Sequence, residues 1–247
     1  MYGKKENKFL FILCPPFCGS TLLHELVSTS LHVSANNVLG NREGQSLPTV
    51  RKIMFDHNER WNEDKKYPWN FIKKEWLKYW DLTKKVLIEK SPPNIIRAAD
   101  IEKIFEPAFF ICMVRNPYAH CESIIRRHKK NPKDAALFSV KCLWYQKKNI
   151  ENLKRVIFFK YEDLVISPEN IKEKIIHFIP ELEDITLNHT FHAHNFKKIP
   201  MKITNLNDEK ISQLTQEQLN GINQIFESER EILQYFNYDL IKTLPNS

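Results

Sequence analysis

The stretch KFLFILCPPFCGSTLLHELVSTS, residues 8–30, decides the fold. Its first part, from Phe9 to Cys14, is a continuous apolar run that is typical of a buried parallel strand. From Leu22 onward the apolar residues recur at helical spacing, and Gly19 lies between the two patterns, where the backbone must turn tightly. The stretch therefore predicts a strand, a tight turn and a helix.

The turn PPFCGST is expected to hold an anion. A helix N-terminus carries unpaired amides and partial positive charge, so we expect the amides of Cys18, Gly19, Ser20 and Thr21 to bind a phosphate. An ordinary corner with Ser20 as the N-cap is the alternative. The turn lacks the first glycine and the lysine of the G-x-x-x-x-G-K-[ST] pattern, which argues against a magnesium-dependent nucleoside triphosphatase.

Three further apolar runs predict strands at Val86 to Glu89, Ala108 to Val114 and Val156 to Phe159. Helical patterns lie between them, at about residues 94–105 and 135–153. This alternation predicts an α/β, three-layer fold with a central parallel sheet flanked by helices and a P-loop-like strand-turn-helix. Ligands of such sheets bind beyond the carboxyl ends of the strands, so we expect the site there.

The rest of the chain is expected to complete one domain over residues 1–247. Trp69, Ile72 and Trp76 keep helical spacing, which favours packing against the core over a sugar-stacking platform. Three segments are predicted outside the strand-helix pattern: a helical, aromatic-rich, acceptor-side segment at 31–84, a loop at 186–205 and a C-terminal helix at 215–240.

Composition narrows the classes of ligand. The net charge of +7 favours an anionic ligand, and the chain has no zinc-finger, RNP-like or basic-helix motif, so nucleic acid is not expected. Five cysteines without a CxxC pair indicate neither a disulfide framework nor a zinc site. The polar N-terminus and the prolines after the first apolar run predict no signal peptide and no membrane span, hence a soluble, cytoplasmic protein.

A second anion site is predicted in MVRNPYAHCESIIRR. Arg115 follows a strand, and Ser123 comes eight residues later in a helical pattern, so both side chains could reach one phosphate. Two anion sites on one sheet indicate a ligand that is phosphorylated at two places.

Together the motifs ILCPPFCGSTLL, VLIEKSPPN, FICMVRNPYAHCESI and FKYEDLVISPE resemble, in order, those of the PAPS-dependent sulfotransferases. The resemblance implies transfer of a sulfuryl group from 3′-phosphoadenosine 5′-phosphosulfate (PAPS) to a hydroxyl or amine. The product of the donor is 3′-phosphoadenosine 5′-phosphate (PAP), and no metal is required. It implies that residues 17–21 hold the 5′-phosphosulfate and that Arg115 and Ser123 hold the 3′-phosphate. It also implies that adenine stacks on or contacts Tyr161, and that Lys197 or Lys198 closes over the 3′-phosphate.

The sequence departs from the family at Phe17, where a lysine or arginine usually neutralises the leaving oxygen. Lys90, in a turn similar to the family's E-K-[ST]-P, is the preferred substitute cation, and Arg42 is the other candidate. Glu43 lies at a position similar to the family's catalytic glutamate and is the expected general base, with Arg42 holding it ionised. His57 is the rival base, since cytosolic members use histidine.

Two other functions stay open. A small-molecule kinase is disfavoured by the missing G-K-[ST] element, and the loss of the basic residue at Phe17 permits a catalytically impaired protein that binds PAP or PAPS. The acceptor is left open among a carbohydrate, a peptide, a lipid headgroup and a small metabolite.

Overall fold

The structure is a computed structural model that describes residues 7–56, 59–192, 200–201 and 203–244. A five-stranded sheet lies at its centre, with strand order β2-β3-β1-β4-β5 and every neighbouring pair parallel. The strands are β1 (Lys8–Leu13), β2 (Val33–Ala35), β3 (Val86–Glu89), β4 (Ala108–Val114) and β5 (Val156–Lys160).

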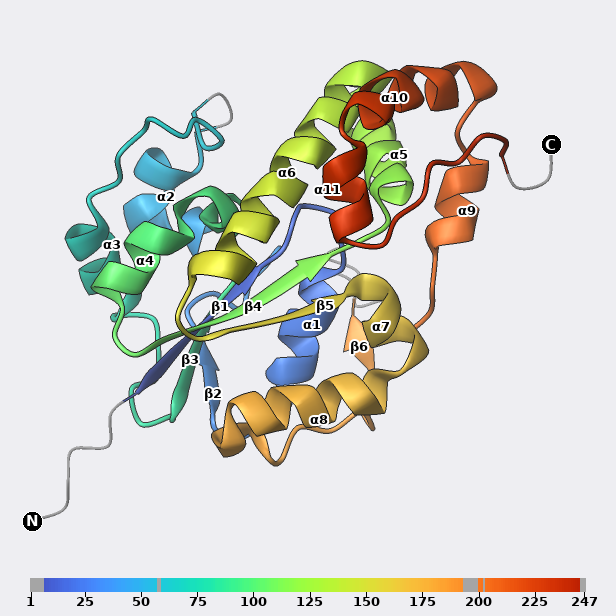
Figure 1. The fold of residues 1–247 in the computed structure, drawn as a ribbon. Helices are drawn as coiled ribbons and strands as arrows, with labels where there is room; N and C mark the ends of the chain where they lie inside the picture. The colour runs from blue at the N-terminus through green and yellow to red at the C-terminus, as the bar shows by residue number, and fades with distance from the viewer. Residues whose placement is uncertain (1–6, 57–58, 193–199, 202, 245–247) are drawn as a thin grey trace, which may run out of the picture.

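Helices cover both faces of this sheet (Figure 1). They are α1 (Ser20–Val27), α2 (Pro48–Met54), α3 (Trp69–Trp76), α4 (Ala98–Ile104), α5 (Pro117–His128), α6 (Pro132–Asn152), α7 (Tyr161–Ile166), α8 (Pro168–Phe178), α9 (Asn207–Ser212), α10 (Gln216–Ser228) and α11 (Arg230–Tyr235). Short 3₁₀ turns lie at η1 (Gly44–Ser46), η2 (Pro92–Arg97) and η3 (Pro180–Leu182).

Alternate residues of β1 fill two separate cores. Leu10 and Ile12 pack with residues of α1 and α8, whereas Phe11 and Leu13 pack with residues of α3 and α4 on the opposite face. All four side chains are buried, because a strand covered on both faces has no solvent side. The predicted three-layer α/β fold with a P-loop-like strand-turn-helix is confirmed.

The four predicted strands are present, but the sheet has a fifth strand that the sequence did not predict. Strand β2 is only three residues long, and it pairs with β3 through Val33 and Val86. Its sequence, Val-Ser-Ala, is short and contains a serine, so the segment lacks the continuous apolar run that predicts the other strands.

Three predicted segments differ in detail. The helix expected at 94–105 begins as the 3₁₀ turn η2, because two prolines open it. The expected C-terminal helix at 215–240 is two helices, α10 and α11, that meet at Glu229. The expected loop at 186–205 contains a short antiparallel ribbon of β6 (Phe191–His192) and β7 (Pro200–Met201).

The aromatic segment around α3 is part of the core. Trp69, Trp76 and Trp80 are buried, and Trp76 lies edge-on to Trp80 with 5.9 Å between the ring centroids. The same cluster includes Phe11 and Phe105. The packing interpretation is therefore confirmed, and these three tryptophans have no open face on which a sugar could stack.

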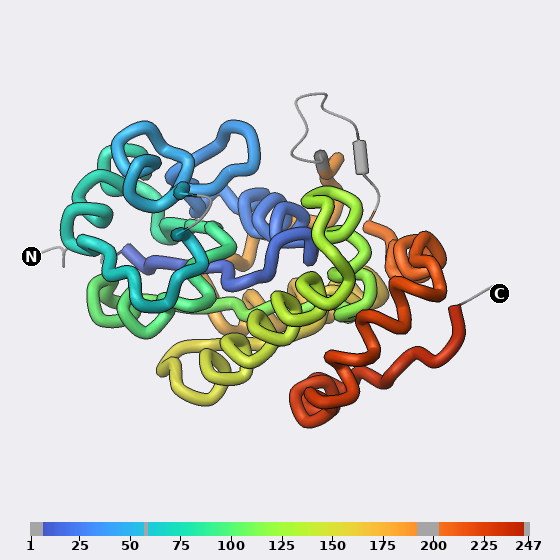
Figure 2. The backbone as a smooth tube through the Cα atoms, turned by 90° about the horizontal axis from the view of Figure 1, so that it is seen from above, coloured from blue at the N-terminus to red at the C-terminus, as the bar shows by residue number. Residues whose placement is uncertain are grey.

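The carboxyl ends of the four longer strands meet at one edge of the sheet, where Cys14, Lys90, Arg115 and Tyr161 follow β1, β3, β4 and β5. Viewed from above, α6 runs beside α10 and α11 and also packs against α5 (Figure 2). No helix within the described ranges is long and apolar enough to cross a membrane.

Candidate functional site

The loop between β1 and α1 turns through two residues with positive φ. Phe17 has φ 64° and Gly19 has φ 92°, and the Cys18 amide donates a hydrogen bond to the Pro15 carbonyl at 3.3 Å. A Cβ atom added at Gly19 would lie 2.6 Å from Cδ2 of Tyr161. The loop therefore requires glycine here both for its conformation and for the close approach of the Tyr161 ring.

The alternative of an ordinary corner capped by Ser20 is wrong, because Gly19 is the N-cap of α1 and no side chain caps the helix. The expectation for the loop amides is also corrected at one residue. The Cys18 amide is already bonded to Pro15, so it is not among the free amides at the helix N-terminus. Burial raises the pKa of the Cys18 thiol. Binding of an anion by Gly19, Ser20 and Thr21, at the start of α1, stays a prediction.

The Phe17 side chain turns toward the end of α5. Its ring lies 5.3 Å from the His128 ring and 5.3 Å from the Arg127 guanidinium carbon. Its backbone carbonyl accepts a hydrogen bond from Nη1 of Arg115 at 3.1 Å. Phe17 therefore contributes its backbone to the site, while the ring supplies packing where the family usually has a cation.

Arg115 is held rigidly at the end of β4. Its Nε donates to Oδ1 of Asn207 at 2.7 Å, and its guanidinium lies 4.2 Å from the centroid of the Tyr161 ring. Its Nη2 is buried and has no hydrogen-bond partner in the described part of the chain. A buried, fixed guanidinium with an unsatisfied N–H is suited to bind an anion.

Ser123 lies beside a lysine that the sequence interpretation missed. Lys210 donates hydrogen bonds to Oγ of Ser123 at 2.8 Å and to Oε2 of Glu122 at 3.1 Å. Burial lowers the pKa of Lys210, and the nearby Arg115 lowers it further, against the effect of Glu122. Arg115, Ser123 and Lys210 therefore form one cationic cluster, although no motif in the sequence connects α9 with α5.

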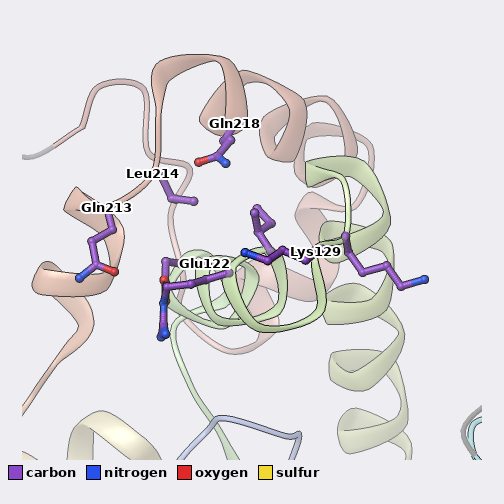
Figure 3. Close-up of a pocket in the computed structure, with 8 residues that line it drawn as sticks. Glu122, Lys129, Gln213, Leu214 and Gln218 are labelled. Atoms are coloured by element: carbon purple, nitrogen blue, oxygen red, sulfur yellow. The ribbon is translucent and has the colours of Figure 1, made fainter.

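A cavity of about 450 Å³ adjoins this cluster, between α5 and the α9–α10 segment. Figure 3 shows the residues that line this cavity. Glu122 on α5 and Lys129 at the C-terminal end of α5 form one wall, and the other wall consists of Gln213, Leu214 and Gln218. Arg126 also lines this cavity and forms an ion pair with Glu122. The surroundings of the cationic cluster therefore include a basic, partly polar recess.

Tyr161 has a packing role in this structure. Its side chain is 5% exposed, its hydroxyl donates to the Thr204 carbonyl at 3.0 Å, and Arg115 covers its ring. The ring therefore fixes Arg115 against the loop. Direct contact between Tyr161 and a nucleotide base stays a prediction.

Glu43 and Lys90 form the second half of the site. Nζ of Lys90 lies 3.5 Å from Oε1 of Glu43 and donates to the Asn41 carbonyl at 2.7 Å, while Gln45 donates to Oε2 of Glu43. Lys90 is only 2% exposed, so it is not a surface lysine. Burial lowers the pKa of Lys90, and the Glu43 carboxylate opposes this shift.

The predicted partner of Glu43 is corrected. Arg42 forms an ion pair with Oε1 of Glu25 on α1 at 2.5 Å, so the expectation that Arg42 holds Glu43 ionised is wrong. Lys90 is the cation beside Glu43. Arg42 has a positive φ of 58°, whereas Glu43 is extended. The two neighbouring side chains therefore leave the backbone in different directions.

Glu89 anchors the segment that carries Glu43. Its carboxyl group is fully buried and accepts hydrogen bonds from the Gly44 amide at 3.0 Å and from the side chains of Ser91 and Asn94. Burial raises the pKa of Glu89 to about 7 despite these bonds. The sequence interpretation used only the neighbouring Lys90 and missed this carboxyl group.

Replacing Gly44 with alanine should displace this segment, because the new Cβ would lie 2.5 Å from Nδ2 of Asn36 and 2.9 Å from Oε1 of Glu89. We expect a loss of about 1–3 kcal/mol in the free energy of unfolding, as for other overpacked buried positions. Urea unfolding of wild type and variant measures it. Gly40→Ala serves as a comparison for backbone strain alone, because no atom lies within 4 Å of a Cβ there while its φ of 55° disfavours a residue with a side chain. An unchanged free energy of unfolding in Gly44→Ala would contradict close packing around Gly44.

Three predicted site residues, His57, Lys197 and Lys198, lie outside the described residues. Among the residues that are described, no group of three or more histidine, cysteine, aspartate or glutamate side chains could hold a metal ion.

A model of the sulfotransferase family matches residues 10–183, which is more than half of the chain and includes Glu43, Lys90 and Arg115. The chain belongs to the sulfotransferase family. No curated protein sequence matches the chain.

Solved sulfotransferase structures share the fold over nearly the whole chain. The sulfotransferase domain from the curacin biosynthetic pathway is 17% identical with a TM-score of 0.61, covering 96% of this chain and 100% of that one. The sulfotransferase domain of the Synechococcus PCC 7002 olefin synthase is 21% identical with a TM-score of 0.57 and 98% coverage of both chains. A mouse sulfotransferase complexed with PAP is 14% identical with a TM-score of 0.52, covering 93% of this chain and 89% of that one. At these identities the likeness shows the fold alone.

Proposed function

We propose that this sulfotransferase moves a sulfuryl group from PAPS to a hydroxyl or amine acceptor. The acceptor oxygen or nitrogen forms a bond to sulfur as the bond between sulfur and the 5′-phosphate oxygen breaks. The electron pair of the broken bond stays on that phosphate oxygen, and the acceptor proton passes to a base. The products are the sulfated acceptor and PAP.

The observation that supports this donor is the position of Arg115 between two anion-binding elements. Nη1 binds the loop carbonyl of Phe17, while Nη2 is buried without a hydrogen-bond partner among the described residues. Ser123 and Lys210 lie in the same cluster. A ligand with a phosphosulfate at the N-terminus of α1 and a second phosphate on this cluster satisfies both elements. PAPS has that charge pattern, whereas ATP carries all its phosphates at one end.

Glu43 is the proposed base and Lys90 the proposed electrophilic cation. The two groups are 3.5 Å apart and buried, so each stabilises the charge of the other before the acceptor arrives. When Glu43 takes the acceptor proton, Lys90 keeps an unbalanced positive charge close to the donor loop. That charge can stabilise the negative charge that develops on the leaving phosphate oxygen.

Calorimetric titration with PAP, with EDTA present throughout and ATP as the control ligand, tests the donor site. We expect tight, metal-independent binding of PAP and much weaker binding of ATP. A positive result is followed by transfer from labelled PAPS to a panel of hydroxyl and amine acceptors. Absence of PAP binding would contradict the proposed donor.

A catalytically impaired PAP- or PAPS-binding protein is the second candidate, and the packing of the Phe17 ring against His128 favours it. In that case the loop supplies no cation to the leaving group, and Lys90 remains neutralised by Glu43. This candidate predicts normal PAP affinity with no transfer to any acceptor in the panel.

A further inference from the structure

A cavity of about 390 Å³ lies directly beside the donor loop. Pro16 of the loop forms one part of its wall, and the opposite parts come from the segment at Arg60 and Trp61 and from α5 and α6. Its volume suits a molecule of one or two fused rings. Because Pro16 lines it, a molecule bound here is adjacent to the group that the loop holds.

The walls of this cavity combine aromatic and cationic side chains. Trp61 and Phe138 meet edge to face with 4.8 Å between their ring centroids, and both line the cavity. The basic side chains that line the cavity are those of Arg60, His128 and Lys130. Among the described lining residues, Asp134 supplies the carboxylate. An aromatic ring that carries a negative charge matches both features.

Arg60 has an unused hydrogen-bond donor. Its Nε is buried and has no hydrogen-bond partner in the described ranges, while its guanidinium carbon lies 5.1 Å from the centroid of the Phe55 ring. Burial lowers the pKa of Arg60, and the Glu43 carboxylate raises it, so Arg60 interacts electrostatically with the proposed base. A buried N–H of this kind needs a partner, and an acceptor anion would supply one.

Hydrogen bonds from other elements hold the backbone of the segment that carries Arg60. Arg97 donates through Nη1 to the Arg60 carbonyl at 2.8 Å and through Nη2 to the Asn62 carbonyl at 2.9 Å. Lys141 of α6 donates to the Trp61 carbonyl at 3.0 Å. These bonds hold the backbone of the segment, and contacts with Phe138 and Phe55 hold the side chains of Trp61 and Arg60, so less ordering is needed when a ligand binds.

We propose that this cavity is the acceptor subsite, that it selects a planar hydroxylated compound with a carboxylate or similar anion, and that Arg60 binds that anion. The inference rests on the proposed sulfotransferase function. A larger cavity of about 800 Å³ between residues 35–41, 46–48 and Arg51 is mainly apolar, but it includes no residue of the donor loop. It therefore lacks the adjacency to the transferred group that an acceptor requires.

The test compares two matched probes, 6-hydroxy-2-naphthoate and its neutral carboxamide, which differ in charge and share the ring and the hydroxyl. Their dissociation constants are measured by fluorescence titration of the 247-residue protein saturated with PAP. We expect the carboxylate to bind at least about tenfold more tightly than the amide, the scale of one charge-assisted hydrogen bond. Arg60→Gln should reduce that preference to about twofold, and Arg60→Lys should retain most of it.

Arg51→Gln is the matched control, because Arg51 stacks on the same Phe55 ring at 5.3 Å but lines the other cavity. It should leave the preference unchanged. Equal binding of the two probes, failure of both to bind, or an unchanged preference in Arg60→Gln would each overturn the inference. PAP binding is titrated on the same samples. Equal binding of the two probes to the wild type with PAP binding intact contradicts only the acceptor subsite, whereas absence of PAP binding in the wild type contradicts the proposed donor.

Discussion

Replacing Glu43 with glutamine should lower kcat by on the order of 100-fold or more while PAP affinity stays close to that of wild type. Glutamine keeps the size of the side chain and cannot take the acceptor proton. The change also removes the negative partner of Lys90, whose Nζ lies 3.5 Å from Oε1 of Glu43. Because Lys90 keeps its hydrogen bond to the Asn41 carbonyl, the segment has a second tether and the fold should survive.

The measurement is initial-rate transfer from labelled PAPS to the best acceptor found, together with calorimetric PAP affinity and thermal unfolding of each variant. Glu75→Gln is the matched control, since Glu75 of α3 is also buried and forms an ion pair with Lys78 at 2.5 Å. We expect Glu75→Gln to change stability without a comparable loss of kcat. This contrast separates the loss of a base from the loss of a buried ion pair.

A wild-type rate in Glu43→Gln would remove Glu43 from the mechanism and make His57 the next candidate base, to be tested with His57→Asn. A parallel fall in kcat and in PAP affinity would instead indicate that Glu43 supports the donor site. Neither result agrees with the role proposed for Glu43.

The strands of the sheet could be predicted from the sequence where a strand contains a continuous run of several apolar residues. Strands β1, β3, β4 and β5 were predicted because each has a continuous apolar run; β1, β3 and β4 are largely buried, whereas β5 at the edge of the sheet is mostly half-buried. Strand β2 was not predicted, because three residues with a serine in the middle leave no such run. The C-terminal helix was predicted as one element, because apolar spacing continues across Glu229, where the backbone leaves the helical conformation.

The site was predictable at strand ends and much less so elsewhere. Arg115 and Lys90 follow strands directly, so the parallel sheet alone places them at one edge. Partners are harder to predict, since an ion pair depends on side-chain direction over several ångströms. For this reason Arg42 was assigned to Glu43 and pairs with Glu25. Lys210 reaches Ser123 from 87 residues away along the chain, and no local pattern records that contact.

Replacing Arg115 with alanine should raise the dissociation constant for PAP by roughly 10- to 150-fold, equivalent to about 1.5–3 kcal/mol for a charged hydrogen bond. The guanidinium is buried and immobilised by Asn207 and by the ring of Tyr161, so little entropy is lost when it binds an anion. Arg155→Ala is the matched control. Arg155 also lies over an aromatic ring, 5.6 Å from the centroid of Phe109, but it precedes β5 at the opposite edge of the sheet.

Alanine at position 115 also removes the hydrogen bond to the Phe17 carbonyl, so the donor loop itself can shift. Adenosine 5′-phosphate separates the two effects, because it lacks the 3′-phosphate and should not bind the cluster of Arg115, Ser123 and Lys210. If Arg115 binds the 3′-phosphate, the preference of the protein for PAP over adenosine 5′-phosphate collapses in the variant. If Arg115 only supports the loop, both affinities fall by the same factor and the preference stays unchanged. The ratio of the two dissociation constants therefore tests the 3′-phosphate assignment independently of any change in the fold.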